Sequence, residues 1–348
     1  MTSEGPMPYS GNILDSPDIL WMEDHWTAEE EEEASRAVAA QGFGLPGAWR
    51  DKYEREARKN WDLFYVRNST NFFKDRHYLG RVFPELAETD ADRELSKVLE
   101  VKGEGCSGRR SGRRTLLELG CGVGNAVFPL LEKNRGLYIV AVDLSSKGIA
   151  LLKRHPMYGC GRCEAMVLDA TVDDLPAAVL EGGGVDLVLL QFSMSAVAPK
   201  DMRRVALLAE RALRPGGKLL LRDYGRHDEA QLRFSKGRRL GDNIYVRQDG
   251  TMSYFFSLDD VRRLFCGRSG PSSSSGREAH HDHHDNNLFP GGGMGASLVE
   301  EELWFVRRQY ANRGQKVARR RVWVHGKFRK PLRLGEARGP ESLPIPPK

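Results

Sequence analysis

Short apolar runs alternate with stretches of helical period through the middle of the chain, and this alternation limits the possible folds most. The apolar runs, each as long as one strand, occupy residues 115–119, 137–143, 165–169, 185–192 and 218–222. Helical periodicity marks stretches between them, for example 147–154 and 201–213. Near-continuous apolar strands that alternate with helices are typical of a parallel sheet covered on both faces. The sequence therefore predicts an α/β fold with a mostly parallel sheet.

Two more apolar segments, 298–310 and 321–328, extend the predicted sheet to seven strands. Residues 312–314 between them include Asn and Gly, which favour a turn, so we expect an antiparallel hairpin at the sheet edge. The predicted domain spans residues 113–331. It contains an insertion at 269–295, whose Ser-, Gly- and His-rich composition predicts disorder and identifies its histidine run as low-complexity sequence.

The segments outside this domain differ from it in composition. Residues 1–48 are polar and include five consecutive glutamates at 29–33, which are typical of a solvated helix or a disordered acidic arm, so we expect an acidic tail. Residues 49–101 mix aromatic with basic side chains and predict a helical extension. A Gly-, Ser- and Arg-rich linker at 102–114 connects this extension to the sheet, and the proline-containing residues 332–348 predict a second tail.

Composition excludes several classes of protein. The 348 residues carry a net charge of +5, and their 5 cysteines are too irregularly spaced for a disulfide framework, which favours a reducing compartment. No apolar run approaches the ~20 residues that cross a bilayer, and the acidic N-terminal region differs from signal and transit peptides. We expect a cytoplasmic protein without membrane contact, in which the basic residues 319–321 could also serve nuclear entry.

A glycine-rich loop after the first apolar run contains the strongest motif. Glu118 is followed by Gly120, Gly122 and Gly124 in the form E-x-G-x-G-x-G. Glycines let the backbone pass close to a ligand, and the N-terminus of the following helix supplies free N–H groups. The third glycine comes one residue earlier than in the dinucleotide fingerprint G-x-G-x-x-G. The motif resembles motif I of the class I (Rossmann-like) S-adenosylmethionine-dependent methyltransferases, and so implies S-adenosylmethionine as cofactor.

Two acids at the ends of the next apolar runs support this interpretation. Asp143 ends the second run 19 residues after Gly124, close to the ~20 residues at which an acid binds ribose hydroxyls. Asp169 ends the third run, where its carboxylate could accept the adenine amino group. The alternative is a tight turn followed by two unrelated acids. The order of loop and acids favours the cofactor site.

Motifs that the sequence lacks narrow the methyl acceptor. Methylation of an exocyclic base amine usually goes with an Asn/Asp-Pro-Pro-aromatic motif after the fourth strand, where residues 191–196 read Q-F-S-M-S-A. Methylation of carbon 5 in pyrimidines needs a cysteine nucleophile, and Cys160 and Cys163 flank the start of the third strand, on the wrong side of the sheet. This pair has half the spacing pattern of a zinc site, so no metal is predicted.

Basic residues gather in three parts of the chain and predict a polyanionic partner. Residues 303–335 contain eleven Lys or Arg and no acid. A second cluster has aromatic neighbours in Tyr245 and residues 254–256, and its cations are Arg226, Arg233, Lys236, Arg238, Arg239 and Arg247. The third is the extension at 49–101. Cations bind phosphates while aromatic faces stack on unpaired bases, so the combination favours an RNA over the alternative of a solvated basic face.

Several strings resemble those of the eukaryotic tRNA 3-methylcytidine methyltransferases. They are NWDLFY at 60–65, FFKDRH at 72–77, LELGCGVGN at 117–125, LRDYG at 221–225, and YVRQDG with SYFF within 245–256. The match spans about residues 59–331. The family methylates nitrogen 3 of cytidine 32 in the anticodon loop, which implies tRNA as partner. Residues 67–70 (RNST) resemble the branch that acts on serine tRNAs, for which the resemblance implies seryl-tRNA synthetase as a further partner.

The resemblance also implies cofactor contacts for residues of the extension and of the strand ends. These residues are Trp61, Tyr65, Gly120, Gly122, Asp143, Asp169, Ala170 and Gln191. Ala170 and Gln191 depart from the family's usual Leu and Ile, which a backbone contact tolerates. Trp61 and Tyr65 lie four residues apart on one helical face. We interpret them as a lid over the cofactor, with core packing as the alternative.

For catalysis, we expect nitrogen 3 of cytosine to attack the sulfonium methyl group without a strong base, because this nitrogen carries a lone pair at neutral pH. A carboxylate near the base would stabilise the cation that forms. Asp223 after the fifth strand is the candidate, with Arg222 and Tyr224 to hold or stack the base; a structural Arg222–Asp223 ion pair is the alternative. Competing functions are a methyltransferase for protein or a small molecule, and a non-catalytic RNA-binding scaffold.

Overall fold

A computed structural model describes residues 21–42, 44–101, 112–267, 295–312 and 314–332. Most of the predicted insertion, of the C-terminal tail and of the linker lies outside the described residues.

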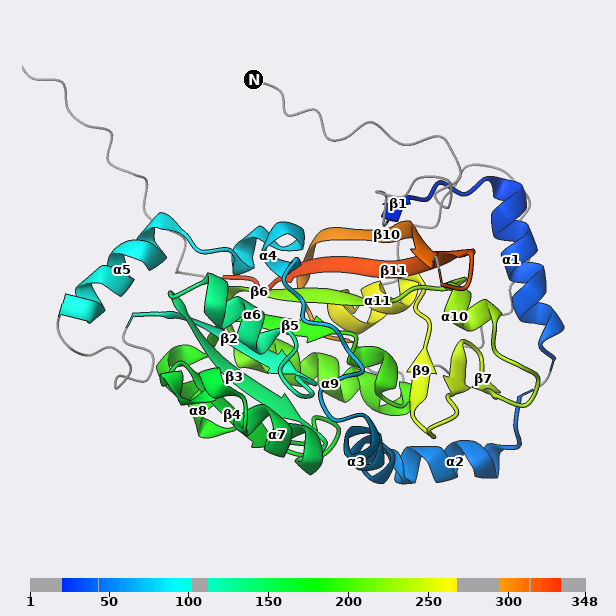
Figure 1. The fold of residues 1–348 in the computed structure, drawn as a ribbon, viewed down its shortest axis with the longest axis horizontal. Coiled ribbons are helices and arrows are strands. Elements are labelled where there is room, and N and C mark those ends of the chain that lie inside the picture. Colours follow the sequence, from blue (N-terminus) through cyan, green and yellow to red (C-terminus); the bar gives the residue numbers. More distant parts are fainter. Residues whose placement is uncertain (1–20, 43, 102–111, 268–294, 313, 333–348) are drawn as a thin grey trace, which may run out of the picture.

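An eight-stranded sheet forms the centre of the molecule (Figure 1). Its strands, in spatial order, are β1 (Trp21–Glu23), β10 (Val299–Asn312), β11 (Val317–Arg329), β6 (Leu213–Tyr224), β5 (Val185–Gln191), β2 (Arg114–Leu119), β3 (Leu137–Asp143) and β4 (Cys163–Val167). Strands β2 to β6 pair in parallel, whereas β11 is antiparallel to both β6 and β10. The predicted parallel sheet and edge hairpin are therefore confirmed, but the sheet has one strand more than the predicted seven.

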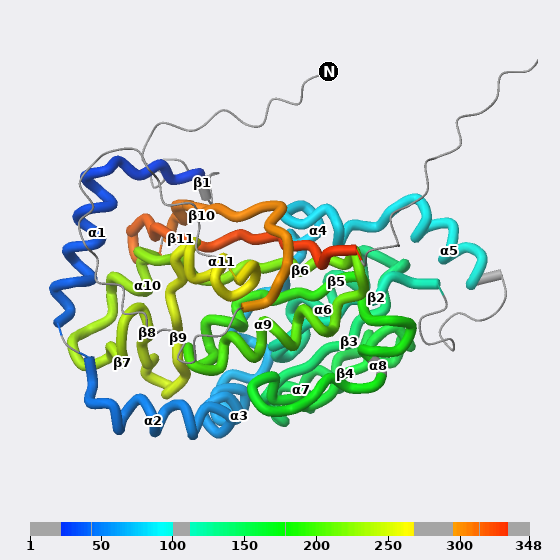
Figure 2. The backbone as a smooth tube through the Cα atoms, turned by 180° about the vertical axis from the view of Figure 1, so that it is seen from behind, coloured from blue at the N-terminus to red at the C-terminus, as the bar shows by residue number. Residues whose placement is uncertain are grey.

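Helices cover both faces of this sheet, because alternate residues of each strand point to opposite sides. Leu116 belongs to one core with α6 (Val127–Lys133) and α7 (Ser146–Lys153), and the next residue, Leu117, belongs to the other. Figure 2 shows this second face, with α9 (Pro199–Ala212) and α11 (Leu258–Cys266) packed on it. Every residue of β3 is buried, as expected for a central strand covered on both sides.

The remaining elements lie around the sheet. They are the helices α1 (Ala28–Ala40), α2 (Gly47–Arg55), α3 (Ala57–Asn68), α4 (Leu79–Val82), α5 (Asp90–Val101), α8 (Ala177–Leu180) and α10 (Glu229–Leu232), and a small sheet of β7 (Arg239–Gly241), β8 (Ile244–Val246) and β9 (Met252–Tyr254). Helices α2 to α5 are the predicted helical extension.

The eighth strand corrects the prediction of an acidic tail over residues 1–48. Residues 21–42, which we call the N-terminal strap, form β1 and α1, and β1 pairs with β10 so that Trp21 lies opposite Tyr310. Thr27 caps α1, since its side chain accepts the Glu30 N–H while Glu30 reaches back to the Thr27 N–H. Residues 1–20 lie outside the described part of the chain.

Ion pairs explain why this acidic segment is ordered. Arg320 of β11 lies 2.9 Å from both Asp24 and Glu30, and Arg307 of β10 pairs with Glu31. The rings and guanidinium groups also stack, because Trp26 faces both Arg307 and Arg320. The strap supplies the acids that residues 303–335 lack. Local composition could not predict that the strap is ordered, because β1 and its partner β10 lie nearly 300 residues apart in the chain.

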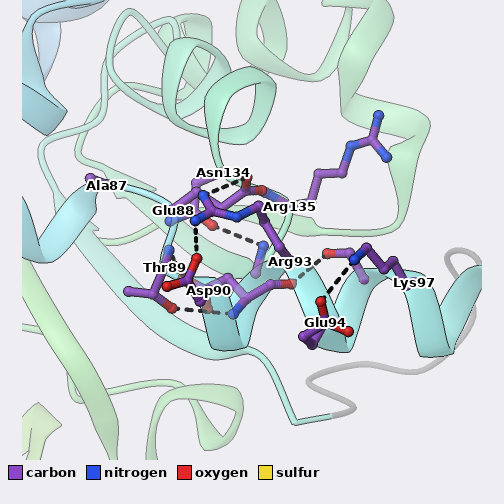
Figure 3. Close-up of polar contacts among 12 residues, drawn as sticks. Ala87, Glu88, Thr89, Asp90, Arg93, Glu94, Lys97, Asn134 and Arg135 are labelled. Carbon is purple, nitrogen blue, oxygen red and sulfur yellow. Dashed lines mark hydrogen bonds and ion pairs between the residues drawn. The ribbon is translucent and has the colours of Figure 1, made fainter.

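A network of polar contacts attaches α5 to the sheet (Figure 3). The Glu88 carboxylate accepts the Arg135 N–H at 2.9 Å, next to the start of β3, and Thr89 caps α5. Asp92, in the first turn of α5, is buried. Its carboxylate accepts bidentate hydrogen bonds from the guanidinium of Arg114 in β2. Burial raises the pKa of Asp92, but the hydrogen bonds from Arg114 and Thr89 outweigh this and hold it below the usual 3.8.

We expect Asp92→Asn to destabilise the fold by about 3 kcal/mol at neutral pH, because it leaves the Arg114 guanidinium without its anion. The low pKa of Asp92 means that its contribution is present above about pH 4 and is lost as the pH falls further, so wild type and variant should converge in acid. Urea unfolding followed by circular dichroism measures the difference. Glu94→Gln, in the exposed Glu94–Lys97 pair, is the matched control and should stay within about 0.5 kcal/mol of wild type.

Candidate active site

A cavity of about 390 Å³ lies at the carboxyl ends of β2, β3, β4 and β5, beneath α3. Small-molecule sites typically enclose about 300–1,000 Å³, and open α/β sheets bind ligands at this edge. All eight residues that the sequence assigned to the cofactor line it: Trp61, Tyr65, Gly120, Gly122, Asp143, Asp169, Ala170 and Gln191. The structure therefore brings the whole predicted set together.

The glycine loop forms one wall of the cavity in a conformation that requires glycine. Gly120 and Gly122 have φ values of +82° and +56°, which side chains disfavour. A Cβ on Gly120 would lie 2.4 Å from the Cβ of Ser193, and one on Gly122 would lie 2.6 Å from the hydroxyl of Tyr65. The loop backbone thus passes close to Ser193 on one side and to Tyr65 on the other. Only glycine at these two positions keeps the space for a ligand open.

Asp143, at the end of β3, fixes this loop from behind. One oxygen of its carboxylate accepts the Gly122 N–H and the other accepts the Ser145 N–H, both at 2.8 Å. Burial raises its pKa to about 6, against the effect of these hydrogen bonds. Each carboxylate oxygen has a second lone pair, so Asp143 can still accept hydrogen bonds from ribose hydroxyls.

Asp169 also lines the cavity, two residues after the end of β4 rather than at its end as predicted. Its carboxylate accepts the backbone N–H and the hydroxyl of Thr171 and lies 3.6 Å from the guanidinium of Arg58. These contacts fix a carboxylate beside Ala170 at the cavity wall, where it can accept an amino group.

Glu118 has the most strongly raised pKa among the carboxylates that line the cavity. It is 3% exposed, and one oxygen of its carboxylate has no hydrogen-bond partner among the described residues. Burial, followed by the negative charge of Asp143, raises the pKa of Glu118 to about 8, although Arg76 opposes the shift. Gln191 and Ser193 add further buried oxygens that lack partners. A cavity with unsatisfied acceptors and acids of raised pKa is suited to a ligand with positive charge and N–H donors.

S-Adenosylmethionine fits this donor and acceptor pattern. Its ammonium and sulfonium groups carry positive charge, its ribose and adenine carry hydrogen-bond donors, and Glu118, Asp143 and Asp169 supply acceptors for them. Because the loop has glycines at positions 120 and 122, the cofactor can approach the backbone of the loop closely. The cavity of this class I fold is therefore our candidate for the cofactor site, and all eight predicted cofactor residues line it.

Helix α3 closes the cavity as a packed wall. Tyr65 is buried in an aromatic cluster with Trp61 and Phe64. Asp62 accepts the Ser145 hydroxyl at 2.5 Å and the Lys147 N–H at 3.2 Å, which attaches α3 to the first turn of α7. Trp61 and Tyr65 therefore pack as a small aromatic core, which was the alternative to a lid, and both also line the cavity.

Three residues without a predicted role also line the cavity. Phe73 and Arg76 come from the loop after α3, and Phe192 follows β5. The guanidinium of Arg76 stacks 5.3 Å above the ring of Phe192, whose φ of +54° is unusual for a bulky residue. The string FFKDRH at 72–77 contained the signal for two of them, but its position in the fold could not be read from the sequence.

The structure places Asp223 and Arg222 outside the cavity lining, which corrects the prediction that Asp223 faces the base. Strand β6 continues to Tyr224, so neighbouring residues point to opposite faces. Asp223 is 0% exposed, and its carboxylate accepts the N–H groups of Ser195 and Tyr224. Burial raises its pKa to about 6. Asp223 thus supports the loop below the cavity, and the two residues do not form the alternative ion pair.

The predicted RNA-binding clusters are also changed by the structure. Six cations of residues 303–335 pair with acids elsewhere in the fold: Arg307, Arg319, Arg320, Arg321, Lys327 and Arg329. In the second cluster, Tyr245 and residues 254–256 are buried in the core. Their rings cannot stack on bases, so this part of the interpretation was wrong.

Within the ranges given above, no group of three or more His, Cys, Asp or Glu has the arrangement of a metal site, and Cys160 and Cys163 are thiols. Among the same residues, no helix is long and apolar enough to cross a membrane.

We expect the ligand-free protein to lose stability as the pH rises from about 5 to 8. Folded Glu118 keeps its proton up to about pH 8, whereas an unfolded glutamate releases it near pH 4.3. Between these values the folded state holds more protons, so each pH unit costs about 1 kcal/mol. Glu118→Gln should flatten this slope in urea unfolding from pH 5 to 8. Glu132→Gln, whose side chain is 61% exposed, should keep it, and an unchanged slope in Glu118→Gln would contradict the assignment.

Comparison with known proteins agrees with this geometry. A family model described as a methyltransferase domain matches residues 117–219. The tRNA N(3)-cytidine methyltransferase METTL6 of Mus musculus is 40% identical over 306 residues, which cover 88% of this chain and 90% of that protein. METTL2 of Danio rerio, with the same description, is 38% identical over 328 residues, or 90% of this chain and 84% of the relative. The chain belongs to the family of tRNA N(3)-cytidine methyltransferases.

Proposed function

We propose that this chain methylates nitrogen 3 of cytidine 32 in the anticodon loop of tRNA, and that serine tRNAs are its substrates. The observation that carries the proposal is the acid-lined cavity at the glycine loop, which extends to Phe192 and Arg76 at the carboxyl edge of the sheet. The relatives' names support tRNA cytidine as the acceptor. Position 32 and serine tRNAs come from the resemblance of residues 67–70 and the other motifs.

The reaction depends on alignment of the cytosine with the methyl group more than on proton transfer by the protein. When bound, S-adenosylmethionine supplies an electrophilic methyl group on a sulfonium centre. Nitrogen 3 of cytosine already has a lone pair, so the chain's task is to hold the two partners in line and to exclude water. Such positioning lowers a barrier by ~7–11 kcal/mol in favourable cases. The packed wall of α3 and the rigid glycine loop are suited to it.

Nitrogen 3 lies on the Watson–Crick edge of cytosine, so the target base has to be unpaired, as a loop base or a flipped one, before it can react. Single-stranded loops are the usual targets of sequence-specific RNA recognition, with unstacked bases held on aromatic rings. Phe192 at the cavity is half-buried and contacts the rings of Tyr224 and Trp323 at centroid distances of 5.1 and 5.9 Å. This aromatic surface beside the cavity is our candidate for the stacking platform.

Nucleoside mass analysis after incubation of the purified chain with labelled cofactor tests the proposal. We expect 3-methylcytidine in total tRNA and at position 32 of serine tRNA transcripts, and no label in total protein or small-molecule extracts. Adding seryl-tRNA synthetase should raise the rate if it is a partner, as the family resemblance implies. A product other than 3-methylcytidine, or label only in protein, would overturn the proposal.

We expect Asp143→Asn to weaken cofactor binding by about tenfold or more, because an amide cannot accept both the Gly122 and the Ser145 N–H groups and one buried donor loses its acceptor. Isothermal calorimetry with S-adenosylmethionine measures the change. Asp174→Asn is the control, since the Asp174 side chain is 79% exposed and lies outside the cavity lining. Equal affinities of the two variants would refute the role of Asp143.

A further inference from the structure

Arg222 is the most unusual charged residue of the described structure. It is 4% exposed, its guanidinium forms no ion pair with a described residue, and its buried Nε atom has no hydrogen-bond partner among those residues. Removing an unpaired charge from water is expensive, and an unsatisfied buried donor calls for an explanation such as a ligand that is absent. The structure therefore raises the question of what Arg222 binds.

Aromatic rings and like charges surround this guanidinium. It lies 4.8 Å from the ring of Trp323 and 5.8 Å from that of Tyr78. The indole Nε1 of Trp323 is a second buried donor without a hydrogen-bond partner among the described residues. Burial lowers the pKa of Arg222, and the positive charges of Arg308 and Arg76 act in the same direction. The cluster therefore has positive charge and free N–H donors, and its surroundings favour an oxygen acceptor.

This cluster lies next to the cavity, on the other side of Gln191 and Phe192. Arg222 lies beside Gln191 in the pairing of β5 with β6, and the Phe192 N–H donates to the Arg222 carbonyl at 2.8 Å. The Gln191 side chain donates to the Tyr78 hydroxyl at 3.1 Å. Gln191 and Phe192 line the cavity, so the same two residues separate the cofactor from the donors of Arg222 and Trp323.

We propose that Arg222 and Trp323 form a donor site for an oxygen of the target nucleotide and thereby position its base against the cofactor cavity. The proposal rests on the function proposed above. The oxygen is either the carbonyl of cytosine, which is adjacent to nitrogen 3, or a phosphate oxygen next to the flipped nucleotide. Arg222 is then a positioning residue, and the free protein retains an unpaired buried charge because the RNA supplies the acceptor.

A comparison of stability with RNA kinetics tests this role. Arg222→Met keeps most of the side chain's volume and removes the unpaired charge, so we expect a melting temperature equal to or above that of wild type. We expect kcat/KM for an anticodon stem-loop to fall at least tenfold, while calorimetry without RNA gives a cofactor affinity within twofold of wild type. Trp323→Phe keeps a ring and removes only the indole donor, and should lower kcat/KM in the same way.

Arg320→Met on the neighbouring part of β11 is the matched control. Arg320 pairs with Asp24 and Glu30, so the same substitution there should lower the melting temperature and leave kcat/KM for the stem-loop within about twofold of wild type.

Two modified stem-loops distinguish the sources of the oxygen. A 2-thiocytidine at the target position replaces the carbonyl by a weak acceptor, and a methylphosphonate removes the charge of the adjacent phosphate. The modification that removes the relevant oxygen should slow wild type at least tenfold and slow Arg222→Met by no more than twofold.

A lower melting temperature or failure to fold in Arg222→Met would assign Arg222 a structural role, and wild-type kinetics in both Arg222→Met and Trp323→Phe would exclude the donor site. If the wild-type protein methylates no tRNA, the proposed function itself fails. If the wild-type protein and both variants methylate tRNA equally well, only the donor site fails.

Discussion

The hydrogen bond between the Asp143 carboxylate and the Gly122 N–H is the contact on which the site depends. It joins the end of β3 to the loop after β2 at 2.8 Å, and it holds Gly122 in a left-handed conformation against the Tyr65 hydroxyl. One carboxylate thus fixes the loop, the space above it and the packing of α3. Because the anion is buried, this arrangement is most favourable when a ligand with positive charge and hydroxyl donors completes it.

Much of this site could be predicted from the sequence because its signals are local. The glycine spacing, the acid at the end of the second apolar run and the alternation of strands with helices each occur within a short stretch of chain, and each corresponds to one structural requirement. The eight residues assigned to the cofactor accordingly meet at one cavity. The mostly parallel sheet followed from the same alternation, since near-continuous apolar strands with intervening helices are typical of it.

The errors arose where a property depended on distant residues. The apolar run at 218–222 predicts that Asp223 follows the strand and faces the base. In the structure β6 continues to Tyr224, so Asp223 lies within the strand. The basic stretch of the hairpin predicts a polyanionic partner, but several of its cations pair with acids of the same chain, such as Asp24 and Asp228, that are far away in sequence. The aromatic string at 254–256 has the composition of a stacking surface but is buried. Exposure and ion pairing are properties of the tertiary structure. Composition shows which residue types are present but not which of them are exposed or paired.

The pairing of β1 with β10 has a consequence for biosynthesis. Trp21 and Tyr310 lie opposite each other, so the first strand leaves the ribosome long before its partner is made. At 5–20 residues per second, the delay is roughly 15 to 60 s. During this interval the acidic N-terminal strap has neither its strand partner nor the arginines of the hairpin. The molecule can close this edge of its sheet only after β10 and β11 have been synthesised.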